Sequence, residues 1–373
     1  MSVYSAEHHR KKEAITFHSN RLTSSLALII SGLVLASTGP AQPSGGREIT
    51  SSQRKPSIPD DAPQFATGYE TSECSASPAN EISWMAFNNT SPLPDASPWA
   101  MSVYYENVGD TSDRYARVID DPTTTEPNKV LHYWLKNATI DTGYQQHTKG
   151  RIQSGFPDEL VDAVEVYATQ RVFIPEDMGL LVEYPPDADP WWIGVIIETL
   201  WSGAAWQGHP NASRITLNIY PQGGQLHLEL ICRSSSDSRV FWDQFNPDYT
   251  LPLGEWLTIE TGYKMGDATT GRMVVVITEE STGQRHVIFD VTNWTYDPIA
   301  DDPDGTGPVP LTHWNPQKLY TSDNVVDFIR DSGGVLQVYF DDFAFSDHWP
   351  TDWPSQPKPT PPPKIERIRQ RAD

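Results

Sequence analysis

The sequence predicts an all-β protein built as an antiparallel sandwich of two sheets. Three observations favour it: many short runs of β-branched and aromatic residues with a period of two, Gly-bearing joins of hairpin length, and almost no helical periodicity. The chain has 373 residues, of which 38% are hydrophobic and 11% aromatic. This length and composition are sufficient for one large hydrophobic core.

Eight runs have the strand pattern, and they occupy 164–174, 191–201, 214–220, 225–233, 255–263, 272–280, 286–291 and 335–345. The joins at 221–224, 267–271 and 281–283 contain Gly and have the length of hairpin loops. One helix is expected at 323–333, where a short helical pattern ends in Gly. So many strands with one helix predict a single large jelly-roll domain over residues 66–349.

Both ends of the chain are expected to lie outside this domain. Residues 1–41 combine a basic region with an apolar run and following small residues, which predicts a signal peptide; an uncleaved membrane anchor is the alternative. Residues 42–65 are rich in Ser, Pro and Gly and predict a linker, while 350–373 form a Pro-rich and then basic tail. We therefore expect a secreted or cell-surface protein, and we expect it to be a monomer.

The charge and the cysteine content exclude several classes of protein. With 27 Lys and Arg against 49 Asp and Glu, the formal charge is −22, and its field repels nucleic acid and anionic membranes. No stretch reaches the roughly 20 apolar residues that span a bilayer. Two cysteines cannot form a disulfide scaffold or a four-Cys zinc site. Cys74 and Cys232 can pair after export, or Cys232 can remain a buried thiol among core leucines.

The predicted hairpin of strands 214–220 and 225–233 has one polar face, because polar and apolar residues alternate along both strands. Planar polar groups and Arg are suited to sugar hydroxyls and carboxylates. We therefore expect Arg214, Asn218 and Glu229 to bind a glycan. The alternative is an ordinary solvated face of an outer sheet.

Tryptophan side chains provide a second set of candidates, because an indole ring can stack on the apolar face of a sugar. Trp191 and Trp192 are the pair of most interest, since neighbours on a strand point to opposite sides and both cannot be in the core. Further candidates, with core packing as the alternative, are Trp201, Trp206, Trp294 and Trp314.

Two segments resemble the concanavalin A-like lectin/glucanase jelly-roll superfamily. GEWLTIETGYKMGDATTGRMVVVITEESTG, at 254–283, has a G-x-W strand followed by a hairpin, and YFDDFAF, at 339–345, resembles the closing strand of these domains. The resemblance covers roughly 130–347 and implies a concave sheet that handles glycans. Because the superfamily contains lectins, hydrolases, lyases and inert modules, function depends on the site.

The Gln-x-His motif at 225–227 is similar to a strand of alginate-lyase-type polysaccharide lyases. Those enzymes also have an earlier Arg-bearing strand and a later strand with Lys and a catalytic Tyr. This chain has Arg151, Lys318 and Tyr320 in that order. It departs from the family in lacking an Arg-x-Glu-x-x-Arg strand and in the short Lys-to-Tyr spacing.

The lyase resemblance implies roles for these residues. Tyr320 would take the C5 proton of a uronate and His227 would assist, with Lys318 on the same strand face. Gln225 and Arg151 would neutralise the substrate carboxylate. Three functions stay open: a lectin-like protein that binds an extracellular polysaccharide, a polyuronate lyase acting by β-elimination, and a structural surface module without a glycan. A retaining hydrolase is not favoured, because no strand has its carboxylate spacing.

The closing strand also contains a vicinal acidic pair, Asp341 and Asp342. Carboxylate oxygens are the ligands that Ca²⁺ prefers, and a structural Ca²⁺ here is consistent with the resemblance and with export. The histidines have no metal-ligand spacing, so we expect no zinc. The sequence contains no P-loop, dinucleotide fingerprint or Gly-x-Ser-x-Gly motif.

Overall fold

The structure is a computed structural model of the chain. It describes residues 65–69, 82–85, 101–105, 111–138, 149–155, 163–185, 193–203, 211–235, 239–298, 308–351 and 353–354. The predicted signal peptide and most of the predicted linker and tail lie outside these ranges. Within them, none of the helices has the length and apolar character needed to cross a bilayer.

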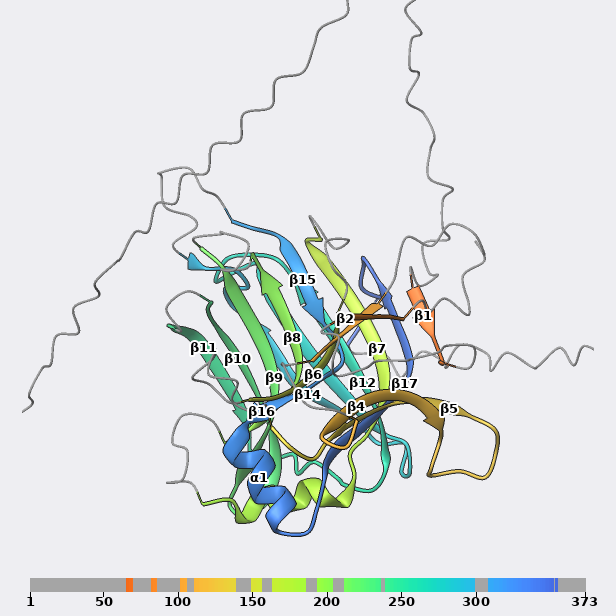
Figure 1. The fold of residues 1–373 in the computed structure, drawn as a ribbon. Coiled ribbons are helices and arrows are strands. Elements are labelled where there is room, and N and C mark those ends of the chain that lie inside the picture. The colour runs from red at the N-terminus through yellow and green to blue at the C-terminus, as the bar shows by residue number, and fades with distance from the viewer. Residues whose placement is uncertain are drawn as a thin grey trace, which may run out of the picture. The chain divides into compact units, whose positions relative to one another are not determined.

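The described strands form two antiparallel sheets, which confirms the predicted all-β jelly-roll sandwich (Figure 1). The eight-stranded sheet has the spatial order β14 (Arg285–Thr292), β13 (Arg272–Glu279), β12 (Trp256–Lys264), β7 (Glu165–Phe173), β17 (Leu336–Ser346), β5 (Lys129–Leu135) and β4 (Arg114–Asp120), with β1 (Phe65–Thr67) paired to β17. The nine-stranded sheet has the order β11 (Val240–Asn246), β10 (Gln225–Ser234), β9 (Ser213–Gln222), β8 (Val195–Ser202), β16 (Lys318–Ser322), β6 (Lys149–Gly155), β3 (Met101–Tyr105) and β2 (Ile82–Met85), with β15 (Leu311–Asn315) paired to β8.

Two helical segments lie together at one end of the sandwich (Figure 1). The predicted helix is α1 (Asp323–Asp331), and the side chain of Ser322 caps it by accepting a hydrogen bond from the Val325 amide. A 3₁₀ helix, η1 (Glu176–Glu183), joins β7 to the following segment. Tyr184 and Phe328 make an edge contact between the two, with ring centroids 5.2 Å apart.

The core lies between the sheets, and the predicted alternation of β9 and β10 places their apolar residues in it. One hydrophobic cluster contains Ile215, Leu217, Ile219, Leu226, Leu228 and Leu230 from the nine-stranded sheet, and Leu257, Ile259, Met273, Val275 and Ile277 from the other. Cys232 is buried in this cluster and forms no disulfide, while Cys74 lies outside the described residues. Burial in the core raises the pKa of the Cys232 thiol.

Chain packing continues past both expected limits of the domain. Phe65, the last residue of the predicted linker, is 1% exposed in β1 and stacks on Phe345, with ring centroids 6.1 Å apart. At the other end, Trp353 is buried on the outer face of the eight-stranded sheet, where its Nε1 donates to Glu260 Oε1 at 2.9 Å. These contacts extend the folded domain from Phe65 to at least Trp353.

Candidate functional site

The outer face of the nine-stranded sheet has a group of polar side chains from five strands, which we call the polar cluster. Its members are Arg151 and Gln153 on β6, Lys318 and Tyr320 on β16, Thr199 and Trp201 on β8, His313 and Asn315 on β15, and Arg214 and Thr216 on β9. They lie opposite the core residues of the same strands because side chains alternate.

Tyr320 is at the centre of the cluster and has cations on two sides. Its strand register pairs it with Arg151, whose guanidinium carbon is 5.8 Å from the centroid of the Tyr320 ring. Lys318 Nζ is 5.1 Å from the same centroid and donates to Thr199 Oγ1 at 3.1 Å. The structure therefore brings together three of the five residues to which the lyase resemblance assigns catalytic roles.

Trp201 lies beside the same cations. The guanidinium carbon of Arg214 is 5.3 Å from its ring centroid, and Lys318 Nζ is 6.0 Å away. Arg214 is directly opposite Arg233 in the β9–β10 register. Burial, together with Arg233, lowers the pKa of Arg214 to about 10, and Tyr320 opposes that shift. Arg214 still carries its charge at neutral pH.

His313 belongs to the cluster but had no role in the sequence prediction. Burial, with Lys318 and Arg151 nearby, lowers its pKa to about 4, so the imidazole is neutral at pH 7. The strand register pairs His313 with Trp201 on β8. The predicted strands did not include β15, and β15 pairs with β8 from more than 100 residues away.

The amide of Asn315 fixes the tautomer of His313. Its Oδ1 accepts from Trp201 Nε1 at 3.3 Å, and its Nδ2 donates to the Ser154 carbonyl at 3.1 Å. Because an indole N–H can only donate and a carbonyl can only accept, the amide orientation is set. Asn315 Nδ2 therefore donates to His313 Nε2, 3.0 Å away, and the ring proton is on Nδ1.

Several buried polar atoms on this face have no hydrogen-bond partner in the described part of the chain. They are Gln153 Oε1, Arg214 Nε, Thr216 Oγ1, Asn218 Oδ1 and Arg233 Nε. Buried polar atoms are nearly always satisfied by protein, water or ligand, since leaving them bare costs about 1–3 kcal/mol each. Such a set on one face is suited to a ligand rich in hydroxyls and carboxylates.

Gln225 and His227 are not part of this group. They are on β10, which β8 and β9 separate from β16, so the predicted partnership of His227 with Tyr320 is not formed. His227 is buried, and its Nδ1 donates to the Tyr249 carbonyl at 2.9 Å. Gln225 lies at the hairpin end of β10 and accepts from Thr250 Oγ1. The Gln-x-His motif thus holds a local turn in place.

Two of the predicted glycan-binding residues interact with each other beside the cluster. Asn218 Nδ2 donates to Glu229 Oε2 at 2.9 Å. Burial raises the pKa of Glu229, while Asn218 and Arg233 oppose the shift. Asn218 is on β9, two residues from Thr216, so this pair borders the polar cluster. Among the described residues, Asn218 Oδ1 has no hydrogen-bond partner.

The tryptophan candidates have different fates. Trp191, Trp192 and Trp206 lie outside the described residues. Trp314 is in β15 and fully buried, so the core-packing alternative holds for it and it cannot stack on a sugar. Trp201 is the indole that lies within the polar cluster.

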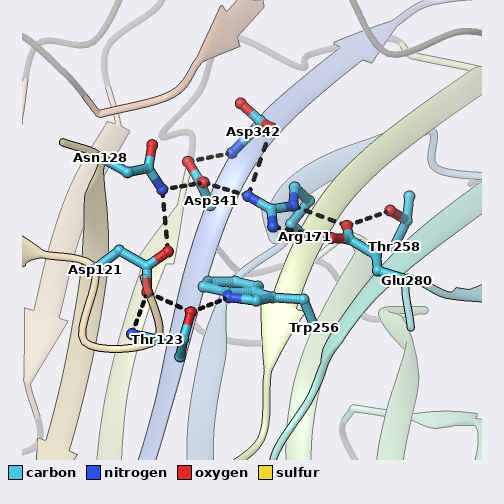
Figure 2. Close-up of polar contacts among 9 residues, drawn as sticks. All are labelled: Asp121, Thr123, Asn128, Arg171, Trp256, Thr258, Glu280, Asp341 and Asp342. Atoms are coloured by element: carbon cyan, nitrogen blue, oxygen red, sulfur yellow. Dashed lines mark hydrogen bonds and ion pairs between the residues drawn. The ribbon is translucent and has the colours of Figure 1, made fainter. Parts of the chain in front are cut away.

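The outer face of the eight-stranded sheet contains a different network, centred on Arg171 (Figure 2). Arg171 Nη1 donates to Asp341 Oδ2 at 2.7 Å, and its Nε and Nη2 donate to the two Glu280 oxygens at 2.8 and 2.9 Å. Asn128 Nδ2 also donates to Asp341 Oδ2, at 3.1 Å, and the Asp342 amide donates to Oδ1 at 2.8 Å. Asp341, which is 1% exposed, is therefore held by nitrogen donors.

This network bears on the predicted calcium site. Ca²⁺ binds six to eight oxygen ligands, whereas the Asp341 oxygens already accept bonds from Arg171, Asn128 and the Asp342 amide. The described residues contain no group of three or more His, Cys, Asp or Glu placed to hold a metal.

The calcium site stays a prediction. If Ca²⁺ binds the folded protein, it should raise the melting temperature. Equal melting curves in EDTA and in millimolar Ca²⁺ would contradict a calcium site.

Comparison with solved structures finds distant similarities. A glucuronan lyase from the fungus Trichoderma reesei is 13% identical and has a TM-score of 0.38, over 65% of this chain and 90% of that one. An alginate lyase from Aplysia kurodai is 11% identical with a TM-score of 0.39 over the same shares. The alginate lyase Aly36B is 12% identical with a TM-score of 0.33, over 62% and 86%. No family model and no curated protein matches the chain.

Replacing Arg171 by Met would leave the buried Asp341 carboxylate without its cation. Breaking a buried ion pair from one side typically costs about 3–5 kcal/mol, so we expect a loss of that size in the free energy of unfolding. The matched control is Lys129→Met, which removes an exposed ion pair with Asp120 and should cost less than about 1 kcal/mol. Burial, together with Asp342, raises the pKa of Asp341 to about 7, so chemical denaturation at pH 8, where Asp341 is mostly ionised, measures both variants, and equal losses would contradict a structural role for Arg171.

Proposed function

We propose that the outer face of the nine-stranded sheet binds an acidic polysaccharide through the polar cluster. The observation that carries the proposal is a concentration of cations in an acidic chain. Arg151, Lys318 and Arg214 lie around Tyr320 and Trp201, although the whole chain has a formal charge of −22. A local positive field in a partly buried site attracts a carboxylate-bearing ligand that the rest of the surface repels.

Four cations form a row across neighbouring strands of this face: Arg151, Lys318, Arg214 and Arg233. The length of this cationic row supports a polymer over a small anion as the ligand. From Arg151 on β6 to Arg233 on β10 there are four strand steps, through β16, β8 and β9. At about 4.8 Å a step, the row is about 19 Å long, which corresponds to several sugar residues. The unpartnered polar atoms lie along the same row, where sugar hydroxyls and carboxylates can satisfy them.

Trp201 supports a sugar ligand within this row. Its indole, which is 9% exposed, is bordered by Arg214 and by Lys318, which is 2% exposed, so an apolar ring lies next to two cations that can pair with a carboxylate. A uronic-acid residue has both features, an apolar ring face and one carboxylate. Nucleic acid also carries negative charge, but it carries that charge on phosphates and lacks this pairing of an apolar ring face with a carboxylate.

Removing one cation from the row tests the binding proposal. We expect Arg214→Met to weaken binding of an oligouronate by roughly 10- to 100-fold, the range for loss of a charge-assisted hydrogen bond. The matched control is Arg272→Met, which removes an ion pair with Asp290 on the opposite sheet and should leave affinity unchanged. Isothermal titration calorimetry measures both variants.

A ligand series completes this experiment. The same oligosaccharide with its carboxylates reduced to alcohols should bind much more weakly, and single-stranded DNA of equal charge should not compete. Equal binding of the acidic and the reduced glycan, or an Arg214→Met protein with unchanged affinity, would contradict the proposal. Absence of binding to any glycan would favour a structural surface module.

A specific arrangement favours a second candidate, cleavage of the bound polyuronate by β-elimination. Tyr320 lies among cations, and the neutral His313 lies near two of the same cations, Lys318 and Arg151. In this reaction a base removes the C5 proton, a double bond forms between C4 and C5, and the C4–O4 bond breaks as O4 takes up a proton. Tyr320 would remove the C5 proton, and Arg214 with Lys318 would stabilise the charge that develops on the carboxylate. His313 takes the place that the resemblance gave to His227.

Ultraviolet absorbance separates cleavage from binding, because the product has a C=C bond conjugated to its carboxylate. If the chain is a lyase, absorbance rises with a polyuronate, and Tyr320→Phe lowers turnover by roughly 10²- to 10⁴-fold while oligouronate affinity is retained. His227→Gln should leave turnover unchanged, since His227 lies on β10, away from Tyr320. No absorbance change with any polyuronate that binds would reject the lyase and leave the lectin-like function.

A further inference from the structure

Glu198 is a buried carboxyl group on the core side of the sheet, directly behind the polar cluster. Glu198 as a whole is 1% exposed. Trp314 Nε1 on β15 donates to Oε1 at 2.9 Å, and Thr261 Oγ1 on β12 donates to Oε2 at 2.9 Å. One carboxyl group thus joins β8 to its neighbour β15 and to the opposite sheet.

The surroundings of this carboxyl are neutral. Leu217 is its register partner on β9, Thr261 faces it from β12 and Trp314 from β15. In the described part of the chain no charged side chain contacts it. Burial therefore raises the pKa of Glu198 to about 7, although both hydrogen bonds oppose the shift.

The hydrogen-bond pattern also fits the protonated acid. The Trp314 indole can only donate, so Oε1 remains an acceptor in either state. The Thr261 hydroxyl can donate or accept, so a protonated Oε2 can donate to Thr261 Oγ1 at the same 2.9 Å distance. Protonation therefore keeps both contacts and removes an uncompensated charge from the core.

A β-bulge in β8 connects this core contact to the cluster. The register shifts between Ile196 and Glu198, and after it Glu198 points into the core while Thr199 points outward to Lys318. On β15, Trp314 points inward between His313 and Asn315, which point outward. The Glu198–Trp314 hydrogen bond therefore fixes, from behind, the two strands that present Thr199, His313 and Asn315.

We propose that Glu198 is a positioning residue that, as the protonated acid, holds β15 against β8 behind the polar cluster, and that its ionisation places an uncompensated charge in the core, disturbs the packing of these two strands and weakens binding at the cluster. The ligand for this effect rests on the proposed function, whereas the effect on stability does not. Few groups of the cluster itself change charge between pH 5 and 8, since the pKa of His313 is about 4 and that of Arg214 about 10. Glu229, whose pKa is raised, is the same in every protein compared below.

The sign of the stability effect follows from the raised pKa. Between the ordinary carboxyl pKa and about 7, the folded protein binds a proton that the unfolded chain releases, so this contribution to stability is lost as pH rises. Glu198→Gln imitates the protonated acid. We expect it to match the natural protein at pH 5 and to have a folding equilibrium constant roughly 10²-fold larger at pH 8.

The matched control is Glu260→Gln. Glu260 is equally buried, but its carboxylate pairs with Arg285, so loss of its charge should destabilise the protein at pH 8. Chemical denaturation of all three proteins at both pH values provides the comparison. A Glu198→Gln protein that is no more stable than the natural one at pH 8 would overturn the proposal.

Oligouronate titrations at pH 5 and pH 8 test the link to the cluster. The natural protein should lose affinity at pH 8 and Glu198→Gln should not, because no charge develops in its core behind β8 and β15. Parallel affinity profiles in the two proteins would overturn the positioning role. If neither protein binds any oligouronate, the proposed function fails, and the denaturation experiment still decides about Glu198. Should Glu198→Gln not fold, the infrared band of a protonated carboxylic acid decides, recorded in an Asp341→Asn protein because burial also raises the pKa of Asp341. Loss of one such band near pH 7 supports the proposal, and its absence at pH 5 overturns it.

Discussion

Burial of one face of the nine-stranded sheet against the eight-stranded sheet determines which side chains are available for function. Along β9, Ile215 and Leu217 enter the core, so Arg214 and Thr216 must point to the other side. A slip of one residue would reverse every side chain, and the large apolar core makes that slip prohibitive. At the β8 bulge the strict alternation of side chains is interrupted, and there a carboxyl group, that of Glu198, enters the core.

The arginines on the two outer faces differ in whether the protein supplies them with carboxylate partners. On the eight-stranded sheet, Arg171 has three carboxylates as partners within the protein, those of Glu280, Asp341 and Asp342. On the nine-stranded sheet, Arg214 lies opposite Arg233, and its Nε has no partner in the described residues. Like charges placed directly across a ladder are destabilising, so folding alone does not account for this arrangement. Sites that violate the rules of stable packing are expected where a ligand completes them.

Local patterns in the sequence predicted much of the fold and part of the site. The period-two alternation in β9 and β10 correctly separated core residues from Arg214 and Asn218. Lys318 and Tyr320 share a face because they are two residues apart on one strand. Similarity to a short motif was a poorer guide, since it selected His227, whose ring is bound to the Tyr249 carbonyl.

Residues that depend on the order of strands could not be predicted in this way. Trp201 bonds to Asn315 across 114 residues, and Arg171 to Asp341 across 170. Spacing within a strand contains no information on which distant strand will be its neighbour. The place of His313 in the polar cluster and the ion pair of Arg171 with Asp341 could therefore be assigned only from the order of strands in the sheets.

A crystal structure with a bound oligouronate of about four residues tests the central claim most directly. We expect the oligosaccharide to lie across β6, β16, β8 and β9, with a carboxylate within hydrogen-bond distance of Arg214 or Lys318 and a sugar ring near Trp201. An oligosaccharide bound instead in the cavity of about 270 Å³ between β11 and β14, or on the eight-stranded sheet, would contradict it.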